Sequence, residues 1–314
     1  MLPTFLIIGA QKSGTTTLYR DLLTQPGVFF PYHKEPTNLA DDRVLTPKGL
    51  AEYEALYASA RPQDARGDAS TGYTRLPRFA DVPRRALRVL GPDVPLIYVV
   101  REPVSRIVSH HHHVRTNTPV PETLEGFIQA DPSTITFSRY AFQLRAWLEH
   151  FDKSRLHVLI FEEYVKDRQG TIERLGQILG YQPQPQRVDP DARFNTAQDR
   201  SADRGWTYWL RTSRLYNRIR PHIPAATRDR LRRALTPKAP PPPPPPSAQC
   251  VQALLAELED DHRQLAELLG RPYPIWDPDA VREKYARLRA QHGQGPAPDP
   301  AKGPVRPPAA RRSA

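Results

Sequence analysis

The chain has 314 residues, enough to bury a substantial core in one large domain or two. Its net charge of +11 favours anionic ligands, but no nucleic-acid-binding motif accompanies the charge, so we expect no nucleic-acid partner. The single cysteine, Cys250, excludes an internal disulfide and agrees with a reducing compartment. No apolar stretch approaches the length of a membrane span, and the first apolar run lacks the charged region of a signal peptide. We therefore expect a cytoplasmic protein.

The first predicted elements are a buried strand at residues 5–8 and a helix at residues 15–23. The strand is an uninterrupted apolar run, and the helix places Leu18, Leu22 and Leu23 on one face. Glycine and hydroxyl residues fill the loop between the two elements. A strand, a glycine-rich loop and a helix in this order are the layout of a phosphate-binding loop.

The loop differs from the nucleotide-triphosphate motif in one important respect. Gly9 and Gly14 have the glycine spacing of that motif and permit tight backbone geometry. The lysine, however, stands inside the loop at Lys12, and Thr15 occupies the usual lysine position. Backbone amides at a helix start bind anions, and a lysine adds a full positive charge. We expect the phosphate contacts to come from Lys12, Ser13, Gly14, Thr15, Thr16 and Thr17.

A second phosphate-binding feature follows the strand predicted at residues 95–100. A triphosphate enzyme needs an acidic residue after such a strand to help hold magnesium, but here the strand ends in Arg101. Since ligands of open α/β sheets bind beyond the carboxyl ends of strands, Arg101 is expected to face the same crevice as the first loop. Ser109, two turns into the next predicted helix, adds a hydroxyl. The sequence thus predicts a grip on two separated phosphates of one nucleotide.

These motifs resemble those of the sulfotransferase family. Gln11 to Thr17 resembles the 5'-phosphosulfate loop, and Tyr98 to Ser109 resembles the 3'-phosphate motif, an arginine followed eight residues later by a serine. Residues 34–36, 67–73 and 138–147 look like segments of the carbohydrate, heparan-type and bacterial branch. The resemblance implies an α/β fold with a P-loop-like central parallel sheet flanked by helices. It also implies 3'-phosphoadenosine-5'-phosphosulfate as the co-substrate.

The resemblance suggests a role for each charged residue of the crevice. Glu35 would act as general base on the acceptor hydroxyl, although a surface ion pair with Lys34 or Arg43 is the alternative. Lys12 would neutralise charge on the departing 5'-phosphate, and Lys34 would grip the sulfuryl oxygens. Asp68 would position the acceptor or support Lys12, unless it is simply a turn residue. We expect no metal, because lysines and amides do the work of magnesium in kinases.

Two further groups of side chains carry weaker signals. His110 to His113 form a run in which only the first and last share a helical face, and no cysteine or carboxylate stands at metal-ligand spacing. We expect exposed or partly packed histidines near the crevice rather than a zinc site. By analogy with the family, Arg139 and Tyr140 lie near the adenine or the 3'-phosphate. A helix-start arginine and a core tyrosine are the alternative.

Proline marks the expected division of the chain, with 36 prolines in all and an unbroken run at residues 240–246. Such a run adopts polyproline II and acts as a semi-rigid spacer. Residues 251–269 have the pattern of an amphipathic helix, with inward leucines at Leu254, Leu255, Leu258, Leu265, Leu268 and Leu269. We expect one main domain at 1–237, a polyproline linker at 238–248, a helical segment docking on the core at 249–290 and a disordered tail at 291–314.

The sequence as a whole favours a bacterial sulfotransferase that acts on a hydroxyl of a carbohydrate, a glycosylated molecule or a small molecule. Residues 193–237, rich in arginine and aromatic residues, would cap the donor by analogy with the family, or would form an ordinary basic surface. One rival is a nucleotide or small-molecule kinase with a variant phosphate loop. Another is a non-catalytic protein that presents its proline run to an aromatic groove.

Overall fold

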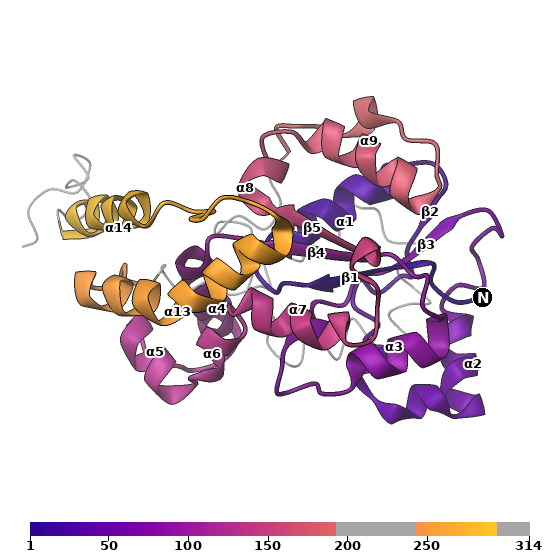
Figure 1. Ribbon diagram of the computed structural model, residues 1–314, viewed down its shortest axis with the longest axis horizontal. Coiled ribbons are helices and arrows are strands. Elements are labelled where there is room, and N and C mark those ends of the chain that lie inside the picture. Colours follow the sequence, from indigo (N-terminus) through magenta and orange to yellow (C-terminus); the bar gives the residue numbers. More distant parts are fainter. Residues whose placement is uncertain (193–242, 294–314) are drawn as a thin grey trace, which may run out of the picture.

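A parallel sheet of five strands forms the centre of the computed structural model, which describes residues 1–192 and 243–293 (Figure 1). The strand order is β2-β3-β1-β4-β5, and every neighbouring pair is parallel. The strands are β1 (Phe5–Gly9), β2 (Val28–Phe29), β3 (Ala65–Asp68), β4 (Leu96–Val100) and β5 (Leu156–Ile160). This architecture confirms the predicted α/β fold with a central parallel sheet flanked by helices.

Helices connect and cover the strands. They are α1 (Thr15–Leu23), α2 (Pro47–Ala55), α3 (Val82–Leu90), α4 (Pro103–Asn117), α5 (Leu124–Ala130), α6 (Ser133–Thr136), α7 (Tyr140–Leu148), α8 (Phe161–Tyr164), α9 (Arg168–Leu179), α13 (Ala248–Leu269) and α14 (Pro278–Gly293). The predicted helix at 15–23 and the strands at 5–8 and 95–100 agree with α1, β1 and β4 to within one residue.

The two faces of the sheet bury two separate hydrophobic clusters. All five residues of β1 are buried, as a central parallel strand requires. Phe5 and Ile7 pack with α1, α8 and α9 on one face, whereas Leu6 and Ile8 pack with α2, α3 and α7 on the other (Figure 1). The alternation of side chains along β1 therefore fixes which helices cover which face.

The centre of the sheet holds the point where the strand order reverses. β1 pairs with β3 on one side and with β4 on the other, in the register Leu6 opposite Leu96 and Ile7 opposite Ile97. The chain leaves β1 toward β2 and β3 and later crosses back to β4. Ligands of open α/β sheets bind at such a reversal, beyond the carboxyl ends of the two strands. The loops after β1 and β4 therefore flank the expected crevice.

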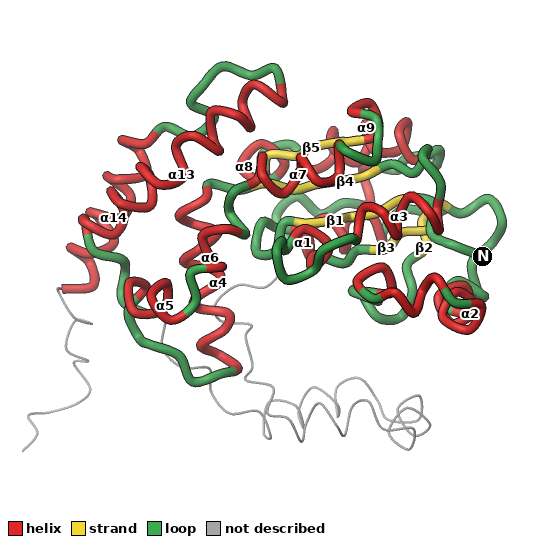
Figure 2. The backbone as a smooth tube through the Cα atoms, turned by 60° about the horizontal axis from the view of Figure 1, so that its bottom comes forward, coloured by secondary structure: helices red, strands yellow, loops and turns green. Residues whose placement is uncertain are grey.

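A third hydrophobic cluster joins the C-terminal helices to the main body. Cys250, Leu254 and Leu258 of α13 pack with Val104 and Ile107 of α4, and residues of α5 and α14 complete the cluster. Figure 2 shows these helices gathered at one end of the sheet. α13 also buries Leu265 in the cluster that contains Leu6 and Ile8 of β1. The helix therefore spans from the sheet to α4. The C-terminal helices are thus packed on the core.

Two local features differ from the sequence expectation. Leu23 is 46% exposed, and Asp21 is buried in its place, where Arg168 Nε donates to its carboxylate (2.9 Å). α14 extends to Gly293, so the residues just after position 290 are helical. The predicted features at 193–242 and 294–314, which include residues 238–242 of the polyproline linker and most of the tail, lie outside the described residues.

Candidate functional site

The loop after β1 has the backbone shape of an anion cradle. Gly14 caps α1 with a left-handed backbone (φ 97°), and Lys12 also has a positive φ of 71°. A side chain at Gly14 would meet the Phe161 ring, since a built Cβ lies 2.3 Å from its Cδ2 atom. The glycine therefore permits both the turn and the close approach of α8. Backbone amides at a helix start, such as those of α1, are donors that favour an anion.

Arg101 lies against this loop, as the sequence predicts for two phosphate contacts in one crevice. Its Nη1 atom is 3.5 Å from the Lys12 carbonyl oxygen, and its guanidinium lies over the Phe161 ring at 5.1 Å. Tyr140 holds the backbone of Arg101, because its hydroxyl donates to the Arg101 carbonyl (2.8 Å) and is buried. Tyr140 thus supports the site through a core position. Ser109 lies half-buried on α4, two turns beyond Arg101.

A fully buried arginine behind the loop was not singled out from the sequence. Arg106 donates to the Thr134 carbonyl (2.7 Å) and lies 3.5 Å from the Gln11 carbonyl. Burial lowers the pKa of its guanidinium to about 10, which still leaves it charged at neutral pH. Its position five residues after Arg101 in the same motif was the available signal. After Lys12 and Arg101, Arg106 is thus the third positively charged side chain next to the loop.

Glu35 lies in the segment between β2 and α2 and contacts Thr71, in the turn after β3. Thr71 Oγ1 donates to both Glu35 carboxylate oxygens at 3.1 Å, and Lys34 Nζ forms an ion pair with Oε1 at 3.1 Å. The Glu35 side chain is 40% exposed, so an acceptor hydroxyl can reach it. The structure therefore contains the ion pair with Lys34 and also leaves the carboxylate accessible.

Asp68, expected to position the acceptor or to support Lys12, is fully buried. Tyr53, Tyr73 and Ser70 donate to its carboxylate at 2.7, 2.7 and 2.6 Å. Ser70 in turn accepts from the Thr37 amide (3.0 Å), two residues after Glu35. Burial raises the pKa of Asp68 to about 6. Asp68 is thus the centre of a network that shapes the Glu35 segment from within the core.

The histidine run also differs from expectation, because His110, His111 and His112 are all buried. His111 packs against Phe127 with ring centroids 4.8 Å apart, and its Nε2 lies 2.8 Å from the Pro121 carbonyl oxygen. Helix α5 packs over these rings. The residues around the histidine run gave no sign of this packing. Within residues 1–192 and 243–293 no group of three metal-binding side chains is assembled.

His110 belongs to a positively charged cluster in the crevice. Burial, reinforced by the charges of Arg106, Arg75, His113 and Lys12, lowers the pKa of His110 to about 2. Its Nδ1 atom is buried without a hydrogen-bond partner, and so is the Arg75 Nε atom. Buried polar atoms of this kind normally have partners, so the cluster is complementary to a polar, anionic ligand.

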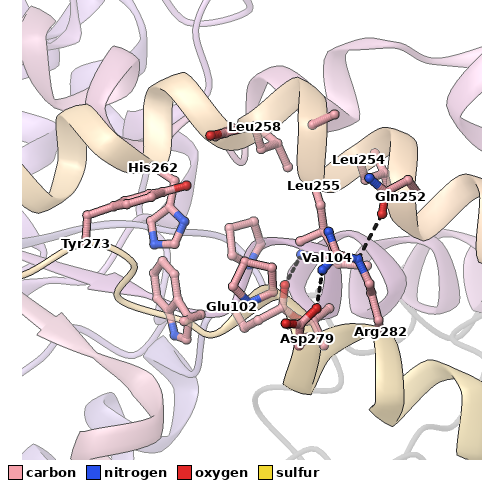
Figure 3. A pocket seen from close by; sticks show the side chains of 16 residues that line it. Glu102, Val104, Gln252, Leu254, Leu255, Leu258, His262, Tyr273, Asp279 and Arg282 are labelled. Carbon is pink, nitrogen blue, oxygen red and sulfur yellow. Dashed lines mark hydrogen bonds and ion pairs between the residues drawn. The ribbon is translucent and has the colours of Figure 1, made fainter.

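A separate cavity of about 270 Å³ lies between α13, α14 and the first turn of α4 (Figure 3). Its lining includes Glu102, His262, Trp276 and Arg282, and contains no residue of the loop after β1. Glu102 is not available to a ligand, because its carboxylate accepts from the Val104 and Ser105 amides at 2.7 and 2.8 Å. The cavity is thus distinct from the crevice at the sheet.

An anion-binding loop at the sheet reversal, with an arginine from the neighbouring strand, defines an α/β protein of the phosphate-loop class. The family model described as "Sulfotransferase domain" matches residues 2–208, more than half of the chain. The chain belongs to the sulfotransferase family, as its two motifs indicated. No helix in the described ranges is long and apolar enough to cross a membrane.

Known relatives agree with this assignment. Heparan sulfate glucosamine 3-O-sulfotransferase 3B1 of Mus musculus is 29% identical over 201 residues, which cover 57% of this chain and 46% of that protein. Heparan sulfate glucosamine 3-O-sulfotransferase 6 of Homo sapiens is 29% identical over 202 residues, covering 61% and 55%. The chain thus spans about half the length of these relatives. A solved sulfotransferase from Alicyclobacillus acidocaldarius shares the fold, with a TM-score of 0.59, 19% identity and coverage of 88% and 99%.

Proposed function

We propose that this protein transfers a sulfuryl group from 3'-phosphoadenosine-5'-phosphosulfate to an acceptor hydroxyl. The observation that carries the proposal is the 3.5 Å approach of Arg101 Nη1 to the Lys12 carbonyl oxygen, which joins two anion-binding features in one crevice. The donor has phosphates at both its 5' and 3' positions. The loop from Lys12 to Thr17 suits the 5' end, and Arg101 with Ser109 suits the 3'-phosphate.

The chemical step assigns one task to each side of the crevice. The acceptor oxygen attacks sulfur, and an O–S bond forms as the bond between sulfur and the 5'-phosphate oxygen breaks. Glu35 takes the hydroxyl proton as general base. The electron pair of the broken bond stays on the 5'-phosphate, where Lys12 and the amides of α1 stabilise the charge. The products are a sulfated acceptor and adenosine 3',5'-bisphosphate.

Contacts of Glu35 support its role as the base. Thr71 fixes the carboxylate by donating to both oxygens (3.1 Å), which leaves further lone pairs for an acceptor hydroxyl. Lys34 is paired with Glu35 at 3.1 Å, so its ammonium lies beside the carboxylate that would receive the proton. We assign Lys34 to the sulfuryl oxygens for this reason.

For the acceptor we propose a hydroxylated carbohydrate, or a glycosylated or hydroxylated small molecule. The names of the curated relatives specify the 3-O position of a glucosamine in heparan sulfate, which is a carbohydrate hydroxyl. Arg75 Nε and His110 Nδ1 are buried polar atoms without a hydrogen-bond partner. Such atoms suit a polyhydroxylated molecule better than an apolar one.

The described residues favour neither rival function. A kinase would need an acidic magnesium ligand after β4, but the Glu102 carboxylate there is bound by the first turn of α4. A proline ligand for aromatic grooves would need an open proline run. Pro246, at the described end of that run, is buried and its carbonyl accepts from Arg289 (2.8 Å).

Binding and transfer assays test the proposal directly. Adenosine 3',5'-bisphosphate should bind the full chain in the presence of a chelator, and ATP with magnesium should bind more weakly. Donor labelled in its sulfuryl group should then transfer label to a hydroxyl acceptor in a panel of oligosaccharides, glycosides and phenols. Magnesium-dependent ATP binding that exceeds bisphosphate binding would instead assign the chain to the kinases.

A further inference from the structure

α14 places a lysine at the first turn of α4, far from any residue of the two phosphate motifs in sequence. Lys284 Nζ donates to Ser105 Oγ at 2.7 Å, and the neighbouring Tyr285 hydroxyl lies 3.4 Å from the same oxygen. These residues follow the matched family model, which ends at residue 208. The contact therefore joins a helix outside the matched region to the start of the 3'-phosphate motif.

The contact of Lys284 is with Ser105, which lies in the sequence between Arg101 and Ser109, the two residues assigned to the 3'-phosphate. Ser105 and Ser109 are four residues apart on α4 and thus share one face of that helix. Arg101 immediately precedes the α4 cap. An ammonium at Ser105 accordingly lies on the face of α4 that leads from Arg101 to Ser109. Burial and the Arg101 charge lower the pKa of Lys284, whereas the Glu102 and Glu162 carboxylates raise it, so Arg101 is one of three charged neighbours of the ammonium.

Lys284 also differs from the arginines around it in its electrostatic partners. Four arginines of α13, α14 and their connection form ion pairs with carboxylates: Arg263, Arg271, Arg282 and Arg287. No carboxylate of the described residues lies within ion-pair distance of Lys284, and its hydrogen bond goes to a neutral hydroxyl. The nearby Glu102 carboxylate accepts from the amides of Val104 and Ser105 and from the Ser105 hydroxyl, so it reaches Lys284 only through that hydroxyl. The ammonium of Lys284, beside Arg101 and bonded directly only to a hydroxyl, can therefore add a charged contact to an anion.

We propose that Lys284 is a third ligand of the donor 3'-phosphate, together with Arg101 and Ser109. The assignment rests on the proposed donor. A lysine side chain is long and rotatable, so Nζ can remain at Ser105 and contact a phosphate oxygen on the same face. α14 then becomes part of the donor site. Through Lys284 it binds the 3'-phosphate, the group that distinguishes this donor from ordinary adenine nucleotides.

Comparison of two nucleotides tests this role. Adenosine 3',5'-bisphosphate and adenosine 5'-monophosphate differ only in the 3'-phosphate, so their affinity ratio isolates that group. In K284M the bisphosphate affinity, measured by calorimetry, should fall about tenfold or more, the worth of a charged hydrogen bond. The monophosphate affinity should change less than about twofold. K284R should restore part of the preference, because it restores the charge.

R287M is the matched control, since Arg287 lies one turn along α14 and pairs with Glu283 instead (3.9 Å). It should leave both affinities unchanged. Equal loss of both nucleotides in K284M, or no loss of either, would overturn the role of Lys284 and leave the donor assignment standing. A wild-type protein that binds the two nucleotides equally would overturn the 3'-phosphate site as a whole, with Lys284 included.

Discussion

The proposed donor side and the proposed acceptor side of the site differ in how the chain holds them in place. On the donor side, the loop from Lys12 to Gly14 presents backbone amides, and its shape is fixed by close packing against Phe161. On the acceptor side, Glu35 stands in an irregular segment, held by side-chain contacts from Thr71 and Lys34. A backbone cradle tolerates little change, whereas a loop held by side chains can adapt to new acceptors.

The largest expected effect comes from removing the proton acceptor alone. Glu35→Gln keeps the shape and the hydrogen bond from Thr71 but cannot accept the hydroxyl proton. We expect kcat to fall by about 10²–10⁴, the usual worth of general-base catalysis. Affinity for adenosine 3',5'-bisphosphate, measured by calorimetry, should stay unchanged because the donor side is intact. Glu52→Gln, at an exposed glutamate of α2, is the control, and wild-type turnover in Glu35→Gln would refute the assignment.

A change on the donor side should affect both kcat and binding. Lys12→Met removes the charge that stabilises the departing 5'-phosphate, so kcat should fall by about 10²–10³. Bisphosphate affinity should fall as well, since the product carries the same phosphate. Lys48→Met, at an exposed lysine of α2, should change neither quantity. If Lys12→Met lowered kcat without any loss of bisphosphate affinity, Lys12 would act only in the chemical step, as Glu35 does, and would not bind the donor.

Packing of the cradle can be tested separately from its charge. Gly14→Ala forces a Cβ to within 2.3 Å of the Phe161 ring, on which Arg101 also rests. We expect bisphosphate affinity to fall about tenfold, because both phosphate contacts shift together. Gly91→Ala is the control: its φ of 81° is similarly strained, but nothing lies within 4 Å of the new Cβ. Equal effects of the two changes on bisphosphate binding would mean that backbone strain, not the Phe161 contact, is responsible.

The same contrast explains what the sequence could predict. β1, α1 and β4 were predicted to within a residue because burial pattern and helical spacing are local properties. The loop after β1 and Arg101 could be singled out because contiguous residues form each motif. The burial of Asp68 and of the histidines was not foreseen, because it depends on Tyr53, Tyr73 and Phe127, which reach them from other elements. The proposed role of Lys284 had no local signal either, since 179 positions separate it from Ser105.

The smallest expected effect concerns stability rather than turnover. Burial lowers the pKa of His110 to about 2, whereas an unfolded histidine titrates near 6.5. Below about pH 6.5 the unfolded chain therefore binds a proton that the native state refuses, and the free energy of unfolding falls as the pH falls, by up to about 1.4 kcal/mol per pH unit. His110→Gln should reduce this slope in urea titrations between pH 7 and 5, and the exposed His292→Gln should not.

The slope of the wild-type protein is a sum over several groups. Asp68 contributes with the opposite sign, because its pKa is raised to about 6 and its stabilising effect is lost as the pH rises through that value. Only the difference between His110→Gln and wild type isolates the imidazole. An unchanged slope in the variant would show that His110 binds its proton equally in the native and unfolded states, and would refute the effect of burial on this imidazole.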